Sequence, residues 1–320
     1  MSHKVAMIGL GVMGQRMLSN MMPHDQFEII AAWDPDAATC AATAAQYPGL
    51  RIGGDAQSVI ADPACDIVYI ASPPIAHRPH ALAALAAGKS VYCEKPLGVD
   101  VAESRELADA AEASGRCCIV NFPLATAHAV GLVEDRMRDQ VLGDVMGVDI
   151  RLHFSQWPRE WQIGAASWLS RRAEGGFARE VLSHWVYLSE RLFGPATLRH
   201  AKTRYPDGDG AESHLHAELD CKGIAVSVAG SIGGAGPDLI EFTVWGLQQS
   251  CRIYDWNRLR VSDGGPWREE MTEIVDARQH GYRQHLDRAA AAFAGESHTM
   301  ASFGDALSVQ VLIEAMLAQS

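Results

Sequence analysis

One lysine in this chain stands where a fixed cation could take part in chemistry. It belongs to Glu94-Lys95-Pro96, which follows the apolar run Val91-Tyr92-Cys93. Proline disfavours the α region for the residue before it, so Lys95 is expected in extended geometry. In open α/β sheets ligands bind at the carboxyl ends of strands. We therefore expect Glu94 and Lys95 to border a nucleotide cleft, with the ammonium group directed at the reacting atom.

A glycine-rich turn predicts the nucleotide itself. Gly9-Leu10-Gly11-Val12-Met13-Gly14 follows the strand-like run Val5–Ile8 and opens a helix. This context lets the backbone of Gly9, Gly11, Val12, Met13 and Gly14 approach a pyrophosphate at a helix N-terminus.

One aspartate bears on the choice between NAD and NADP. Asp34 ends the second predicted strand, 20 residues after Gly14. A carboxylate there bonds the adenosine ribose and repels a 2′-phosphate, which favours NAD, with NADP as the alternative. A second interpretation is that Asp34 only caps the helix that starts at Pro35-Asp36.

The loop after the third strand ends at the same edge of the sheet. Ser72-Pro73-Pro74 and His77 follow Ile67–Ala71. Ser72, Pro73 and His77 could border the nicotinamide ribose. Alternatively, the two prolines merely start a helix and His77 is a surface residue in its first turn.

The second half of the chain supplies a proton-transfer pair. Glu180, His184 and Tyr187 share one helical face by their spacing. Histidine titrates near neutral pH, so His184 suits proton exchange with a hydroxyl or amine, and Glu180 could orient its ring. The alternative is a purely structural pair.

Four of the eight tryptophans lie between 157 and 185, interleaved with arginine and glutamine. Such a segment could bind a sugar ring or a flat ring with a carboxylate. We expect Trp161 and Arg172 to be its substrate-binding residues. The alternative is packing at an interface.

The order of elements predicts an α/β fold class with two domains. Residues 1–122 alternate short apolar strands with helices, as in a parallel sheet covered on both faces. After that, alternating strands such as 144–154 predict a large, mostly antiparallel open sheet in an α+β domain. We assign 1–122 to dinucleotide binding and 123–320 to substrate binding and oligomerisation.

Composition excludes several classes of function. The net charge of −12 over 320 residues argues against nucleic-acid binding. No apolar run is long enough for a membrane helix, and no signal peptide is recognised. Seven scattered cysteines without a CxxC pair predict reduced thiols in a cytoplasmic protein, and no metal site is predicted.

The combination of motifs resembles the glucose–fructose oxidoreductase / inositol dehydrogenase (Gfo/Idh/MocA) family. The motifs are the Gly9–Gly14 turn, Ser72-Pro73-Pro74-x-x-His77, Glu94-Lys95-Pro96 and Gly175-Gly176-x-x-x-Glu180-x-x-x-His184. The resemblance is dense over 4–122 and thinner afterwards. It implies a Rossmann domain, a C-terminal domain with a large open sheet, and hydride transfer to or from a nicotinamide. It also implies Lys95, Glu180 and His184 as catalytic residues, and a homodimer or homotetramer formed through that sheet.

Three departures from the family pattern bear on the substrate. Glu180 stands where family members usually have an aspartate. Tyr187 stands three residues after the histidine, where they often have a polar or acidic residue. The segment Asn121-Phe122-Pro123 lacks the basic pair that many members have there. The leading hypothesis is an NAD-dependent dehydrogenase of a sugar, cyclitol or related polyol. The alternatives are a reductase of a C=N or conjugated C=C bond, and a non-catalytic NAD-binding regulatory protein.

Overall fold

The structure is a computed structural model that describes residues 2–206, 208–274 and 276–319. The chain forms two units, one of Met1–Phe122 with Tyr282–Leu307 and one of Pro123–Gly281 with Ser308–Ser320. Across the described residues, no helix is long and apolar enough to span a membrane.

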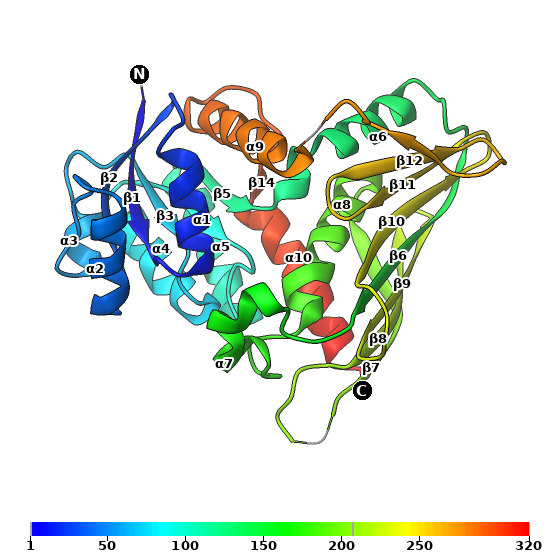
Figure 1. Cartoon of the computed structure of the whole chain (residues 1–320), viewed down its shortest axis with the longest axis horizontal. Helices are drawn as coiled ribbons and strands as arrows, with labels where there is room; N and C mark the ends of the chain where they lie inside the picture. The colour runs from blue at the N-terminus through cyan, green and yellow to red at the C-terminus, as the bar shows by residue number, and fades with distance from the viewer. Residues whose placement is uncertain (1, 207, 275, 320) are drawn as a thin grey trace. The chain divides into compact units, whose positions relative to one another are not determined.

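The first unit is built on a six-stranded sheet in the order β14-β5-β4-β3-β1-β2, parallel except for β14 (Figure 1). Strand order reverses beside β1, which pairs with β2 on one side and β3 on the other. Such a switch point is where doubly wound sheets bind nucleotides. The elements are β1 His3–Ile8, α1 Val12–Met21, β2 Phe27–Trp33, α2 Ala37–Gln46, α3 Ala56–Ile60, β3 Ile67–Ile70, the 3-10 turn Pro74–Ala76, α4 His77–Ala86, β4 Ser90–Glu94, α5 Val101–Ser114 and β5 Cys118–Asn121, joined later by most of α9 Ala277–Phe293 and by β14 Ala301–Ser302.

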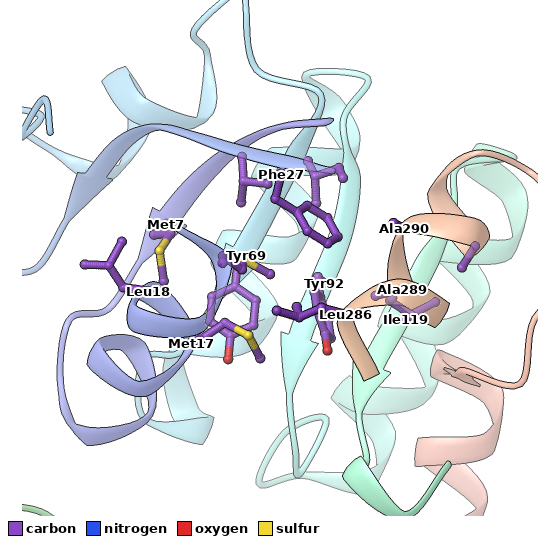
Figure 2. Packing of buried hydrophobic residues seen from close by; sticks show 14 of the residues in the cluster. Met7, Met17, Leu18, Phe27, Tyr69, Tyr92, Ile119, Leu286, Ala289 and Ala290 are labelled. Atoms are coloured by element: carbon purple, nitrogen blue, oxygen red, sulfur yellow. The ribbon is translucent and has the colours of Figure 1, made fainter. Parts of the chain in front are cut away.

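The first unit ends its N-terminal part at Phe122 and also contains a later segment, 282–307. Strand β14 pairs antiparallel with β5 and extends its edge. From α9, Leu286, Ala289 and Ala290 are at most 2% exposed and join the core that contains Tyr92 and Ile119 (Figure 2). The segment returns because β4 and β5 would otherwise leave an apolar face uncovered.

The second unit contains an eight-stranded sheet in the order β13-β12-β11-β10-β6-β9-β8-β7. Among the strands that the structure describes in this sheet, only β6 and β9 pair in parallel, so the prediction of a large, mostly antiparallel sheet is confirmed. Its elements are the 3-10 turn Pro123–Ala125, α6 His128–Arg138, β6 Val145–Phe154, the 3-10 helix Glu160–Ala165, α7 Ala166–Leu169, the π-helical turn Ala178–Leu182, α8 Ser183–Phe193, β7 Ala196–Arg204, β8 His214–Cys221, β9 Ile224–Ile232, β10 Leu239–Gly246, β11 Ser250–Tyr254, β12 Arg258–Ser262, β13 Arg268–Glu270 and most of α10 Phe303–Leu317.

One face of this sheet carries the packing. On β6, Val148, Ile150, Leu152 and Phe154 are at most 2% exposed, as their alternation predicts. Helix α8 lies along the sheet (Figure 1), and its Trp185 stacks on Phe242 of β10 with ring centroids 5.7 Å apart. The helix that carries His184 of the predicted proton-transfer pair is therefore fixed to the sheet by a fully buried aromatic contact.

Candidate functional site

The glycine turn follows β1, and its three glycines serve different purposes. Gly9 has φ +94°, and a Cβ there would meet the Ala71–Ser72 backbone at 2.6 Å. A Cβ on Gly14 would lie 2.1 Å from the carbonyl oxygen of Gly9. A Cβ on Gly11, in contrast, would meet no atom of the described residues within 4 Å. Packing therefore requires Gly9 and Gly14, whereas Gly11 leaves open space in front of α1.

That open space faces the start of a helix without a cap. Helix α1 has Gly11 at its N-cap, no side-chain hydrogen bond to its first turn and no acidic residue there. Val12 is 39% exposed. The first amide groups of a helix lack intrahelical partners and, with the helix dipole, attract anions. The turn fits a pyrophosphate group.

Asp34 is tied to the glycine turn. Its Oδ2 accepts a hydrogen bond from the Leu10 amide at 2.7 Å, and its Oδ1 accepts one from the Asp36 amide at 2.9 Å. The N-cap of α2 is Asp36, whose carboxylate accepts from Ala38 and Thr39. The interpretation of Asp34 as the helix cap is therefore wrong. A carboxylate held at this position suits the recognition of ribose hydroxyls.

The loop after β3 contributes a buried hydroxyl. Ser72 Oγ is buried and has no hydrogen-bond partner among the residues that the structure describes. Buried polar groups are normally paired, so this hydroxyl fits a ligand group. Pro73 beside it is exposed, and Pro74 begins the 3-10 turn that leads into α4.

His77 is not a surface residue, because it is 1% exposed. Its Nδ1 lies 2.8 Å from the Pro96 carbonyl oxygen and its Nε2 lies 2.8 Å from that of Ser72. Burial lowers the pKa of His77 to about 4, against the two carbonyl groups, which raise it. His77 thus links the loop after β3 to the residue that follows Lys95, and its predicted contact with the nicotinamide ribose stays a prediction.

Lys95 follows a strand end that buried polar groups hold in place. Glu94 is 5% exposed and its Oε1 accepts hydrogen bonds from the Tyr69 hydroxyl and, at 2.6 Å, from the Asn121 amide. Tyr92 in turn donates to Asn121 Oδ1 at 3.2 Å. Glu94 therefore joins β3, β4 and β5 where the strands end, and Lys95, partly buried, projects from this fixed edge. The positive charge of Lys95 also acts on His77, where it helps to lower the pKa.

In the second unit, the helix with Glu180 and His184 starts over a buried carboxyl group. Glu212 is 1% exposed, and its Oε1 accepts a hydrogen bond from the Ala178 amide at 2.7 Å. Gly176 has φ +101°, and a Cβ there would lie 2.1 Å from Glu212 Oε2. Gly176 is therefore glycine because Glu212 occupies the space beside it.

Glu180 lies in the π-helical turn that precedes α8. Such turns are rare and are frequent at functional sites. Its Oε1 accepts a hydrogen bond from the Gln162 amide at 3.0 Å, and Gln162 Oε1 accepts from Arg159 Nε at 2.9 Å. The Arg159 guanidinium lies 4.8 Å from the Trp161 ring centroid. Glu180 and Trp161 thus belong to one chain of contacts, with Trp161 43% exposed.

His184, 5% exposed, contacts an aromatic residue from another element. Its ring is 5.1 Å from that of Trp256, in a T-shaped arrangement at 87°. Trp256 also lies 5.6 Å from Trp185. The imidazole therefore has a defined neighbour on the hairpin between β11 and β12.

Arg172 lies apart from this chain of contacts. Its guanidinium stacks on the Tyr205 ring at 3.7 Å, and its amide donates to the Asp209 carbonyl oxygen. Arg172 is exposed, so its role in substrate binding stays a prediction.

The sequence reasoning missed five residues that organise these groups: Tyr69, Asn121, Gln162, Glu212 and Trp256. Asn121 had a signal, because it ends a strand beside Glu94. The others act through contacts distant in sequence. Among the described residues, no group of three or more His, Cys, Asp or Glu could hold a metal ion.

The parallel sheet of the first unit, with the glycine turn and Asp34 at the carboxyl ends of its strands, defines a dinucleotide-binding α/β protein. Residues 3–122 match the family model GFO_IDH_MocA, described as an oxidoreductase family with an NAD-binding Rossmann fold. The chain is 34% identical over 118 residues to an inositol 2-dehydrogenase of Acidothermus cellulolyticus, covering 36% of this chain and 34% of that protein. It is 30% identical over 145 residues to a D-glucoside 3-dehydrogenase of Escherichia coli, covering 45% and 40%. Residues 3–122 thus match the NAD-binding Rossmann domain of the Gfo/Idh/MocA family of oxidoreductases.

The whole chain also has a structural match. An NAD-binding oxidoreductase from Klebsiella pneumoniae superposes with a TM-score of 0.84 at 20% identity, over 99% of this chain and 96% of that one. At this identity the match shows the fold of both units and nothing more. The matched stretches span 33% to 45% of the length of the first four curated relatives.

Proposed function

We propose that the protein is an NAD-dependent dehydrogenase that interconverts a hydroxyl and a carbonyl group on a sugar, cyclitol or related polyol. The observation that carries the redox assignment is the open face of Gly11 in front of the uncapped α1, beside the buried Ser72 hydroxyl. The substrate class is supported by the relatives named inositol 2-dehydrogenase and D-glucoside 3-dehydrogenase.

The residues of the first unit fit the cofactor. The amides at the start of α1, with Val12 and Met13, would hold the pyrophosphate, and Asp34 would accept hydrogen bonds from the ribose. When bound, the nicotinamide supplies the hydride acceptor or donor. The fixed charge of Asp34 disfavours a 2′-phosphate, which is why NAD is proposed over NADP.

The proton-transfer roles follow from the chemistry of three side chains. His184 exchanges a proton with the substrate hydroxyl, and Glu180, oriented by Gln162, steadies the charged imidazole. Lys95 stabilises negative charge on the reacting oxygen. Trp161 offers an exposed ring for the apolar face of a sugar, and Arg172 an exposed guanidinium for its polar groups.

The first experiment is a substrate panel. Purified protein is mixed with NAD or NADP and with myo-inositol, D-glucose, methyl glucoside or a cyclic amine. In a separate assay it is mixed with an enone and the reduced cofactor. The absorbance of the reduced nicotinamide is followed in both. We expect turnover with NAD and at least one polyol. Turnover only with the amine or the enone would favour the reductase alternative. Bound NAD without any turnover would favour a regulatory protein.

The second experiment separates binding from chemistry. Lys95→Ala should leave NAD affinity within a few-fold and lower kcat by roughly 10² to 10³, as expected for loss of a charge-stabilising donor. Lys202→Ala, at an exposed position of β7, is the matched control and should change neither. Unchanged turnover in Lys95→Ala would refute the role of Lys95.

A further inference from the structure

We infer that Trp256 is the residue that positions the His184 imidazole, an inference that rests on the proposed function of His184. The two side chains come from separate elements, α8 and the tip of the β11–β12 hairpin, yet their rings form a T-shaped pair at 5.1 Å. A ring packed on its flank restricts how an imidazole can rotate and keeps water from that side. The substrate and cofactor roles proposed above do not include Trp256.

The backbone of Trp256 is in a conformation that bulky residues rarely adopt. Asp255 and Trp256 have φ of 44° and 71°, in the loop that joins the paired residues Tyr254 and Arg258. Aspartate tolerates the left-handed region, whereas a tryptophan there is an outlier. Residues held in such conformations persist where the surrounding structure fixes them, and they cluster at functional sites.

Packing against Trp185 fixes the position of the Trp256 indole. Trp256 lies 5.6 Å from Trp185, which is fully buried and stacks on Phe242 of β10 at an interplanar angle of 21°. Trp185 is the neighbour of His184 in α8. The aromatic column Phe242–Trp185–Trp256 therefore connects the sheet to the imidazole, so that movement of the hairpin tip is transmitted to His184.

A purely structural role for Trp256 predicts a different outcome, so the test needs a readout on His184 itself. In protein labelled with ¹³Cε1-histidine, the His184 signal is assigned by its loss in His184→Asn. The Trp256→Leu variant keeps an apolar side chain but removes the ring current, and Trp256→Phe keeps a ring. Trp245→Leu, a partly exposed tryptophan on β10, is the matched control.

We expect Trp256→Leu to move and broaden the His184 signal and to leave the thermal unfolding temperature nearly unchanged. Trp256→Phe should restore a single sharp signal, and Trp245→Leu should leave it as in the wild type. With the panel compound that turns over fastest, kcat should fall about 10- to 100-fold in Trp256→Leu while the KM for NAD stays constant.

Two results separate the inference from the proposed function. A His184 signal that shifts in Trp256→Leu but stays a single sharp line, as loss of the ring current alone would cause, would overturn the positioning role, whatever the activity. An unchanged kcat in His184→Asn would instead refute the catalytic role of His184, on which the inference rests.

Discussion

Replacing Glu212 with glutamine should change how the stability of the second unit depends on pH. The carboxyl group is buried beneath the start of the helix that carries Glu180. Burial raises its pKa from 4.5 to about 7, against the hydrogen bond from Ala178 and the charge of Arg179, which lower it. Arg179 itself pairs with Glu314 of α10 at 2.6 Å. The charges of Glu212, Arg179 and Glu314 all act on Tyr205 as well.

The size of the effect follows from the two pKa values. In the unfolded chain the carboxyl group loses its proton near pH 4.5, whereas the folded chain keeps it until about pH 7. The folded state therefore binds more protons in this window, and the free energy of unfolding falls as the pH rises through it. One pKa unit is about 1.4 kcal/mol, so the whole contribution is about 3 kcal/mol, and roughly 2 to 3 kcal/mol of it lies between pH 5 and pH 8.

Urea denaturation followed by tryptophan fluorescence measures this quantity in the second unit, because every tryptophan except Trp33 belongs to it. A glutamine at 212 accepts the Ala178 hydrogen bond but does not ionise. We expect Glu212→Gln to be more stable relative to wild type at pH 8 than at pH 5, by roughly 2 to 3 kcal/mol.

Glu218→Gln, at an exposed position of the neighbouring β8, serves as the control and should follow the wild type at both pH values. If Glu212→Gln and wild type lost stability in parallel from pH 5 to pH 8, the buried carboxyl group would not be titrating in this range and the reasoning would fail.

Five further predictions concern stability, the cofactor, the substrate and assembly. Gly14→Ala should destabilise the first unit by about 1 to 3 kcal/mol in thermal or urea unfolding, because its Cβ would collide with a backbone carbonyl. Gly11→Ala should unfold like wild type yet bind NAD more weakly in calorimetry; unchanged affinity would show that no ligand uses the open face. Asp34→Asn, which keeps one acceptor for the Leu10 amide, should raise the NADP-to-NAD ratio of kcat/KM by about tenfold or more, since a repelling charge is removed; a constant ratio would leave Asp34 a purely structural link. Trp161→Ala should raise the KM of the polyol more than it lowers kcat, and an equal effect on both would argue against a binding role. The homodimer or homotetramer expected from the family resemblance stays a prediction, which sedimentation velocity will test.

Local sequence patterns determined most of the first unit. Alternating strands and helices, the glycine turn and Asp34 at the end of β2 are all features of short segments, where spacing and residue type dictate backbone geometry. The same holds for the alternating strands of the second sheet. The role of Gly14 also follows from its close backbone approach to Gly9 within one turn, whereas the role of Gly9 depends on the distant Ala71–Ser72 backbone.

Only the tertiary structure decided which distant segments meet. Nothing in the two residues of β14 or in the helix before it indicates that they return to the edge of the first sheet, because pairing and burial depend on what remains uncovered there. Gly176 is a glycine because of Glu212, 36 residues later, and the neighbour of His184 is a tryptophan from a hairpin tip. Residue type and spacing could therefore identify the reactive groups, but the side chains that hold them in position are fixed by packing between elements, which no local pattern encodes.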